Sequence, residues 1–155
     1  MTFQISPLDP ASFAHLFDLS DAELARHNAR RQRVTAKPDV PCRVSLADAE
    51  IGEDVLLVNH QHQPADSPYQ SSHAVYIRPN VQPAALDIGE VPEVIASRLI
   101  SLRMFDATGM IVDADVVDGV DLGPALERGF ENAKAAYAHI HFAKPGCFAA
   151  VANRA

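Results

Sequence analysis

The stretch from Arg98 to Val117 reads RLISLRMF-DATG-MIVDADVV, two apolar runs separated by four residues that end in Gly109. Two such runs around a short, glycine-ended turn predict a β-hairpin. Further strands are predicted on both sides of it, over Asp54–His62, His73–Arg78, Tyr137–Phe142 and Cys147–Val151, with a short one near the N-terminus at residues 2–6. Most connections between these strands are too short for crossovers, so we expect a mainly antiparallel sheet.

Helices are predicted in three parts of the chain. Asp9-Pro10 fits the start of one helix, and Ser20 with Glu23 forms a capping box for a helix that runs to about Arg30. A single helical turn is expected over 92–96 and a longer helix over 123–133. The prediction is an α+β fold in which one domain, residues 1–155, has about six strands with helices packed on one face.

Composition limits the classes of function. A chain of 155 residues with a net charge of −7 is one domain by size and a poor candidate for binding nucleic acid. No apolar run approaches about 18 residues and the first ten residues do not resemble a signal peptide, so we expect no membrane partner and a bacterial cytoplasmic location. The basic run 26–33 is interpreted as the solvated end of a helix.

Two His-x-His pairs are the first candidate for chemistry. His60 and His62 lie on one predicted strand, and His139 and His141 on another. Residues i and i+2 of a strand point to the same face, so each pair presents two imidazoles together. Imidazole is the commonest metal ligand, so a divalent transition metal is one reading for these four residues. The alternative is histidines that simply face solvent or bond to backbone carbonyls.

The polar loop between His62 and His73 is the second candidate. It contains two prolines, Pro64 and Pro68, and carries Asp66 and the hydroxyls of Ser67, Tyr69 and Ser72. With Arg43 or Arg78 these groups would suit an anionic or polar small-molecule ligand. The alternative is that they only form the turns that such a loop needs.

The third candidate is Cys42, which directly precedes Arg43. A neighbouring cation favours the thiolate, and a nearby histidine would complete a nucleophile. On this reading the catalytic residues are Cys42, His62 and His139. The alternative is a buried structural thiol, which applies equally to Cys147, and the sequence does not show whether the two cysteines meet.

Four segments together resemble a known family: PCRVSLADA from Pro41, GEDVLLVN from Gly52, PADSPYQSSHA from Pro64 and HIHFAKPGC from His139. They are similar to the bacterial family catalogued as domain of unknown function twelve-oh-three. The resemblance covers nearly the whole chain and implies a single-domain protein with no assigned activity. It also implies an aromatic residue at the position of His60 and Gly-Pro at His73-Ala74, so roles for these histidines would be particular to this chain.

Two hypotheses of function follow. The first is a small cytoplasmic enzyme or small-molecule binder whose site joins the 62–73 loop, Cys42 with Arg43, and the strand of His139 and His141. The second is a non-catalytic interaction module, a homodimer that pairs through the edge of the alanine- and valine-rich C-terminal hairpin. Phosphate-binding glycine loops and the nucleophile elbow of hydrolases are absent from the sequence.

Overall fold

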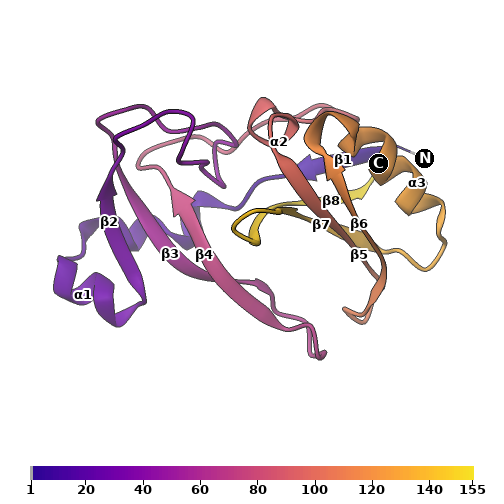
Figure 1. Cartoon of the computed structure of the whole chain (residues 1–155). Helices are drawn as coiled ribbons and strands as arrows, with labels where there is room; N and C mark the ends of the chain where they lie inside the picture. Colours follow the sequence, from indigo (N-terminus) through magenta and orange to yellow (C-terminus); the bar gives the residue numbers. More distant parts are fainter. Residues whose placement is uncertain (1) are drawn as a thin grey trace.

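The predicted hairpin is present as β5 (Leu99–Phe105) and β6 (Ile111–Asp118). Figure 1 shows their place in the computed structural model, which describes residues 2–155. They form one side of a five-stranded antiparallel sheet in the order β1-β8-β7-β5-β6. Its other strands are β1 (Phe3–Ser6), β7 (Tyr137–Phe142) and β8 (Cys147–Arg154).

A second antiparallel sheet of three strands lies beside the first (Figure 1). Its order is β2-β3-β4, with β2 (Ala29–Arg33), β3 (Asp54–Gln63) and β4 (Ser71–Ile77). The α+β, mainly antiparallel class is therefore confirmed. The structure has eight strands in two sheets among the described residues, where about six strands had been expected in one sheet. A long connection without strands separates β4 from β5, the point at which the chain passes from the smaller sheet to the larger one.

The helix that begins at Ser20 is shorter than predicted. The capping box is present, but α1 spans only Asp21–Arg26. Asn28 then adopts a left-handed conformation, with φ of 51°, and the chain turns into β2 along β3. The interpretation of residues 26–33 as a helix end therefore holds for Arg26, in the last turn of α1, and is wrong for Ala29–Arg33, which form β2. Arg31 and Arg33 lie on a strand and form ion pairs with Asp21 and Asp54.

The remaining helices are divided between the two sheets, since Leu16 packs in the core of the smaller sheet and Val94 and Leu126 pack in the main core. They are the 3-10 segments η1 (Pro10–Ser12), η2 (Ala14–Asp18) and η3 (Gly119–Asp121), the single turn α2 (Glu93–Ala96) and α3 (Leu122–Glu131). α3 lies against β5 and β6, and its Leu126 and Phe130 are fully buried in the main core. Across residues 2–155, no helix is long and apolar enough to cross a membrane.

The alternation of β5 and β7 assigns two roles to the two faces of the larger sheet. Ile100, Leu102 and Met104 of β5 join Ala138 and Ile140 of β7 in the main core under α3. The residues between them point to the opposite face. There the imidazoles of β7 meet a side chain from the end of β3, so this face joins the two sheets.

The C-terminal hairpin does not form a sheet edge. β8 lies between β7 and β1, and β7 lies between β8 and β5. Because β1 pairs with Val151–Arg154, this half of the strand that was expected to carry a homodimer is already paired on both sides within the chain. A homodimer stays a prediction.

Candidate metal centre

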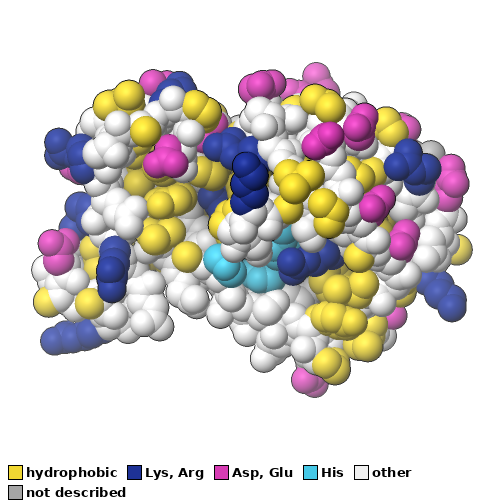
Figure 2. Space-filling view, viewed as in Figure 1, with side chains coloured by type: hydrophobic (Ala, Val, Ile, Leu, Met, Phe, Trp, Pro, Cys, Tyr) yellow, Lys and Arg dark blue, Asp and Glu magenta, His cyan; other side chains and the backbone are white. Residues whose placement is uncertain are grey.

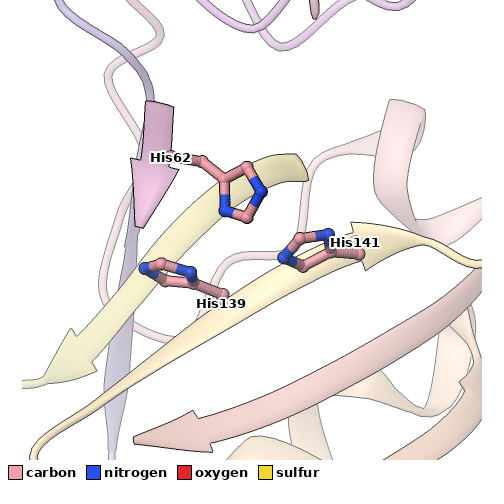
Figure 3. Close-up of side chains that lie close together, drawn as sticks. All are labelled: His62, His139 and His141. Atoms are coloured by element: carbon pink, nitrogen blue, oxygen red, sulfur yellow. The ribbon is translucent and has the colours of Figure 1, made fainter. Parts of the chain in front are cut away.

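Three histidines from two strands converge at one point. Each of His62, His139 and His141 offers one nitrogen, and the three nitrogens all lie within 4.8 Å of one another. Figure 3 shows the rings of His139 and His141 side by side on β7, with the ring of His62 above them from β3. The structure thus brings together three of the four histidines that the sequence suggested as metal ligands.

Strand geometry explains the arrangement. His139 and His141 are two apart on β7, so they share a face, and β5 and β8 on either side hold β7 in place. The register of β3 against β4 shifts between His60 and Gln63, an irregularity in the ladder at His62. The ring centroid of His62 then lies 4.9 Å from that of His141 and 5.9 Å from that of His139.

Each of the three rings has a nitrogen without a hydrogen-bond partner. Within the part of the chain that is described, these are His62 Nδ1, His139 Nδ1 and His141 Nε2, all buried. The other nitrogen of His141 donates to the carbonyl oxygen of Gly146 over 3.1 Å, which leaves a free lone pair on Nε2. A histidine held through its second nitrogen by a carbonyl is the usual arrangement around a bound metal.

Burial keeps all three histidines neutral at physiological pH. Their exposed fractions are 9% for His62, 3% for His139 and 0% for His141. Desolvation lowers the pKa of His62 to about 4, that of His139 to about 4 and that of His141 to about 3. The positive charge of Arg103 lowers the pKa of all three further. Neutral imidazole is the form that binds a metal, so no proton competes with a ligand at neutral pH.

Aromatic rings enclose the histidines. The ring of Phe148 stacks on His62 with centroids 5.5 Å apart and also contacts His139 and His141 edge-on. Phe105 lies 4.8 Å from His139. Figure 2 shows histidine side chains at the surface, in the hollow at the centre of this face and next to a basic side chain. The three converging rings are themselves almost fully buried, so the site is mainly apolar.

His60 and His73 lie outside this group. His60 packs edge-on against Phe13 at 5.6 Å and tilts toward Phe148, and burial lowers its pKa. His73 pairs with His60 across β3 and β4, and its Nδ1 lies 3.3 Å from the carbonyl oxygen of Ala74. The structure thus does not place His60 among the converging nitrogens, so we remove it from the metal set.

The polar loop after His62 mostly bonds to itself and to the β5–β6 turn. Ser67 Oγ donates to the carbonyl oxygen of Gly109 over 2.9 Å and accepts from the backbone of Tyr69. The ring of Tyr69 packs 6.2 Å from Phe105, which places the loop at the rim of the centre. Asp66 and Ser72 are exposed. The loop is a wall of the site, and the hydroxyls of Ser67 and Ser71 bond to backbone carbonyls of the turns.

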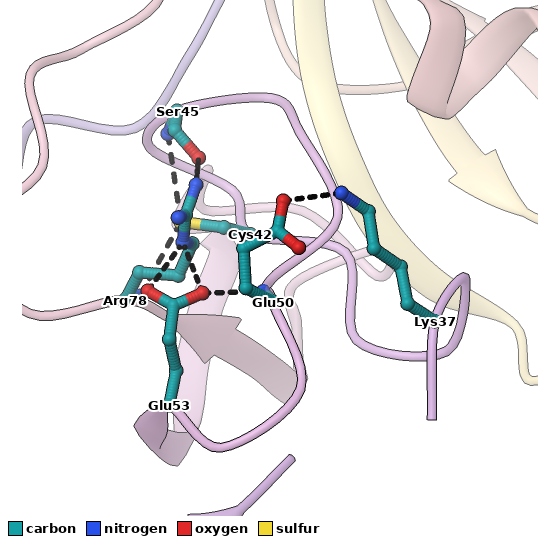
Figure 4. A network of polar contacts seen from close by, with 6 residues as sticks. All are labelled: Lys37, Cys42, Ser45, Glu50, Glu53 and Arg78. Carbon is teal, nitrogen blue, oxygen red and sulfur yellow. Dashed lines mark hydrogen bonds and ion pairs between the residues drawn. The ribbon is translucent and has the colours of Figure 1, made fainter. Parts of the chain in front are cut away.

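Cys42 belongs to a different environment. Its side chain is 1% exposed in the core of the smaller sheet. Its sulphur accepts from the backbone N–H groups of Ser45 and Arg78, within the polar network of Figure 4 that joins Arg78 to Glu53. No histidine appears among these partners in the described chain. We therefore remove Cys42 from the catalytic set, and both cysteines are free thiols.

Arg43 is likewise structural. It is 1% exposed and donates to the carbonyl oxygens of Pro41 and Phe148 and to the sulphur of Cys147. It borders a cleft of about 660 Å³ between the two sheets, whose charged lining residues are Asp39, Arg43, Arg98 and Lys144. Because Arg98 is paired with Asp48 and Arg43 is used internally, two of the three cations of this cleft are already bound.

Sequence reasoning missed Arg103. It lies on β5 directly opposite His139 on β7. Strand alternation could have indicated its direction, since Ser101, Arg103 and Phe105 share the face opposite the apolar Leu102 and Met104. Only the pairing of β5 with β7, which the sequence does not show, places Arg103 beside the histidines.

The family of the chain follows from comparison with known proteins. Residues 39–154 match a family model described as Protein of unknown function (DUF1203). The chain belongs to this family. The match begins at Asp39 and contains all three converging histidines together with Arg103. No curated protein and no solved structure matches the chain.

Proposed function

We propose that this DUF1203 protein is a small metal-dependent enzyme of the bacterial cytoplasm that acts on a small molecule. Its metal ligands are His62, His139 and His141. Two observations carry the proposal: one nitrogen from each of the three rings lies within 4.8 Å of the others, and each ring has a buried nitrogen without a hydrogen-bond partner. Buried polar atoms are nearly always bonded, so three unpartnered atoms in one cluster of rings imply a missing partner.

The spacing suits a metal of the first transition series. Zinc binds imidazole nitrogen at about 2.0–2.1 Å, so two ligands of a tetrahedral ion lie about 3.4 Å apart. Closing the group from at most 4.8 Å to that separation needs side-chain shifts of about 1 Å. Three neutral ligands leave a fourth position open, which is the arrangement of catalytic rather than structural zinc sites. A metal there would activate a bound water or polarise a substrate oxygen.

Metal titration of the EDTA-treated protein tests the proposal. We expect one equivalent of zinc, cobalt, nickel or manganese to bind in calorimetry and to raise the melting temperature, because a ligand of the folded state stabilises by about 2.7 kcal/mol at 100 times its Kd. His139→Ala should lose this shift. His60→Ala is the matched control, since it removes the other histidine of a His-x-His pair from outside the converging group.

Two results would refute the metal centre. One is wild-type protein whose melting temperature no metal changes and in which elemental analysis finds none. The other is an unchanged affinity and stoichiometry in His139→Ala. The metal-induced shift, not the melting temperature itself, is compared between variants, because each substitution also alters the packing around Phe148.

A further inference from the structure

Arg103 is a partly buried cation beside the metal centre. It lies opposite His139 in the β5–β7 ladder, and directly opposed residues of an antiparallel pair have Cβ atoms about 4.5–5.5 Å apart. The one hydrogen bond recorded for its side chain is from Nε to Ser101 Oγ, at 3.3 Å. Over residues 2–155 its guanidinium has no ion pair with a carboxylate, so its terminal nitrogens are available.

The neighbouring strands explain why no acid is present. On β6, Asp113 and Asp115 stand opposite Met104 and Leu102, which face α3. The β6 residue opposite Arg103 is Ala114. Asp113 and Asp115 therefore lie on the other face of the sheet, and the third acid of β6, Asp118, pairs with Leu99 at the far end of β5. On the face of Arg103, β7 contributes Tyr137, His139 and His141, none of which is a carboxylate.

We propose that Arg103 binds the oxyanionic group of the substrate, a carboxylate or a phosphoryl group, beside the metal held by His62, His139 and His141. This inference rests on the proposed metal centre. A guanidinium presents a planar fork of donors that matches two oxygens of such a group. A divalent ion on three neutral ligands next to Arg103 leaves an excess of positive charge, and an anion between them relieves the repulsion.

This electrostatic argument predicts that the metal and the anion help each other to bind. Linkage requires the effect to be reciprocal, so the anion raises metal affinity by the same factor as the metal raises anion affinity. Without Arg103 the metal should bind at least as tightly in chloride, because a repelling charge is gone. The gain that the anion brings should then be mostly lost.

The test is cobalt(II) binding to the EDTA-treated full chain, measured by calorimetry at constant ionic strength. The buffers contain sodium chloride alone, acetate or methylphosphonate. For the wild type we expect acetate or methylphosphonate to tighten cobalt binding by about fivefold or more, within the usual range of coupling. Arg103→Met should bind cobalt without this gain, and Arg103→Lys should retain only part of it. Arg30→Met, at an exposed position on β2, is the control.

The outcomes separate the two proposals. Suppose that the wild type binds cobalt, but that the anions either leave its cobalt affinity unchanged or raise that of Arg103→Met by the same factor. The role of Arg103 is then refuted and the metal centre stands. If the wild type binds no cobalt, the metal centre is refuted. Acetate is then titrated into the metal-free protein while the NMR signal of Arg103 Nε is followed. A shift of this signal supports the anion site, and an unchanged signal refutes it. Circular dichroism verifies that Arg103→Met is folded, and Arg103→Lys provides the comparison if it is not.

Discussion

Acidification is expected to destabilise the metal-free protein steeply above the pH at which carboxylates titrate. His62, His139 and His141 have pKa values of about 4, 4 and 3 in the folded chain, against 6.5 for an unperturbed imidazole. The unfolded chain therefore takes up protons first as the pH falls. The stability contributed by the neutral histidines is fully present above about pH 6.5 and is lost progressively toward pH 4.

The magnitude follows from the linkage relation. Each pKa unit corresponds to about 1.4 kcal/mol, so between pH 7.5 and pH 5 each histidine should lower the free energy of unfolding by about 2 kcal/mol. The three together remove about 6 kcal/mol, which is a large part of the 5–15 kcal/mol that usually stabilises a domain. His60, whose pKa burial also lowers, adds to the loss in the same direction.

Urea denaturation in EDTA, followed by circular dichroism at pH values from 7.5 to 5, measures this loss. Replacing His139 with glutamine removes one titrating ring, so the variant should lose about 2 kcal/mol less than the wild type over that interval. His15→Gln, at an exposed site, is the control and should follow the wild type. The reasoning fails if the wild type unfolds with the same free energy at pH 7.5 and pH 5, or if His139→Gln shows the full loss.

Two further predictions concern the contacts that hold the site. Gly109→Ala should lower the free energy of unfolding by about 1–3 kcal/mol in urea, because φ is 81° and the new Cβ would lie 2.4 Å from the loop docked on the turn; Gly52→Ala, with φ of 92° and open space, should lose less. Asp48→Asn should cost about 1–3 kcal/mol in the same assay, because it breaks a largely buried pair with Arg98 at 2.7 Å. Asp21→Asn, which removes an exposed ion pair with Arg31, should change the free energy of unfolding by less than about 1 kcal/mol. Equal losses in the two variants would contradict this account.

Local patterns predicted the elements well where one physical signal dominated. The apolar runs around Asp106–Gly109 became β5 and β6, and the capping box at Ser20 is formed as expected. The end of that helix was missed because nothing in the residues after Arg26 favours a strand strongly. β2 exists because β3 offers a partner for its backbone, and pairing between distant segments overrides helix propensity.

The candidate site was predictable in kind but not in membership. A shared face for His139 and His141 follows from strand alternation alone, and the structure has it. The same rule put His60 with His62, yet only His62 joins the centre, because the ladder is irregular after His60 and His60 packs against Phe13. A shift of register changes which side chains face a site, and it leaves no clear mark in a single sequence.

Arg103 shows most clearly what the fold adds to the sequence. Along the chain, Asp106, Asp113 and Asp115 all follow Arg103 within twelve residues, and simple proximity would pair it with one of them. In the hairpin, Asp113 and Asp115 point to the helix side, while Arg103 points to the histidines. A cation without a carboxylate beside three neutral imidazoles is an unusual combination, since each group would be more stable in water. Such a combination is expected at a functional site, where bound molecules supply the missing charge and hydrogen bonds. A metal ion together with an anionic substrate would supply both.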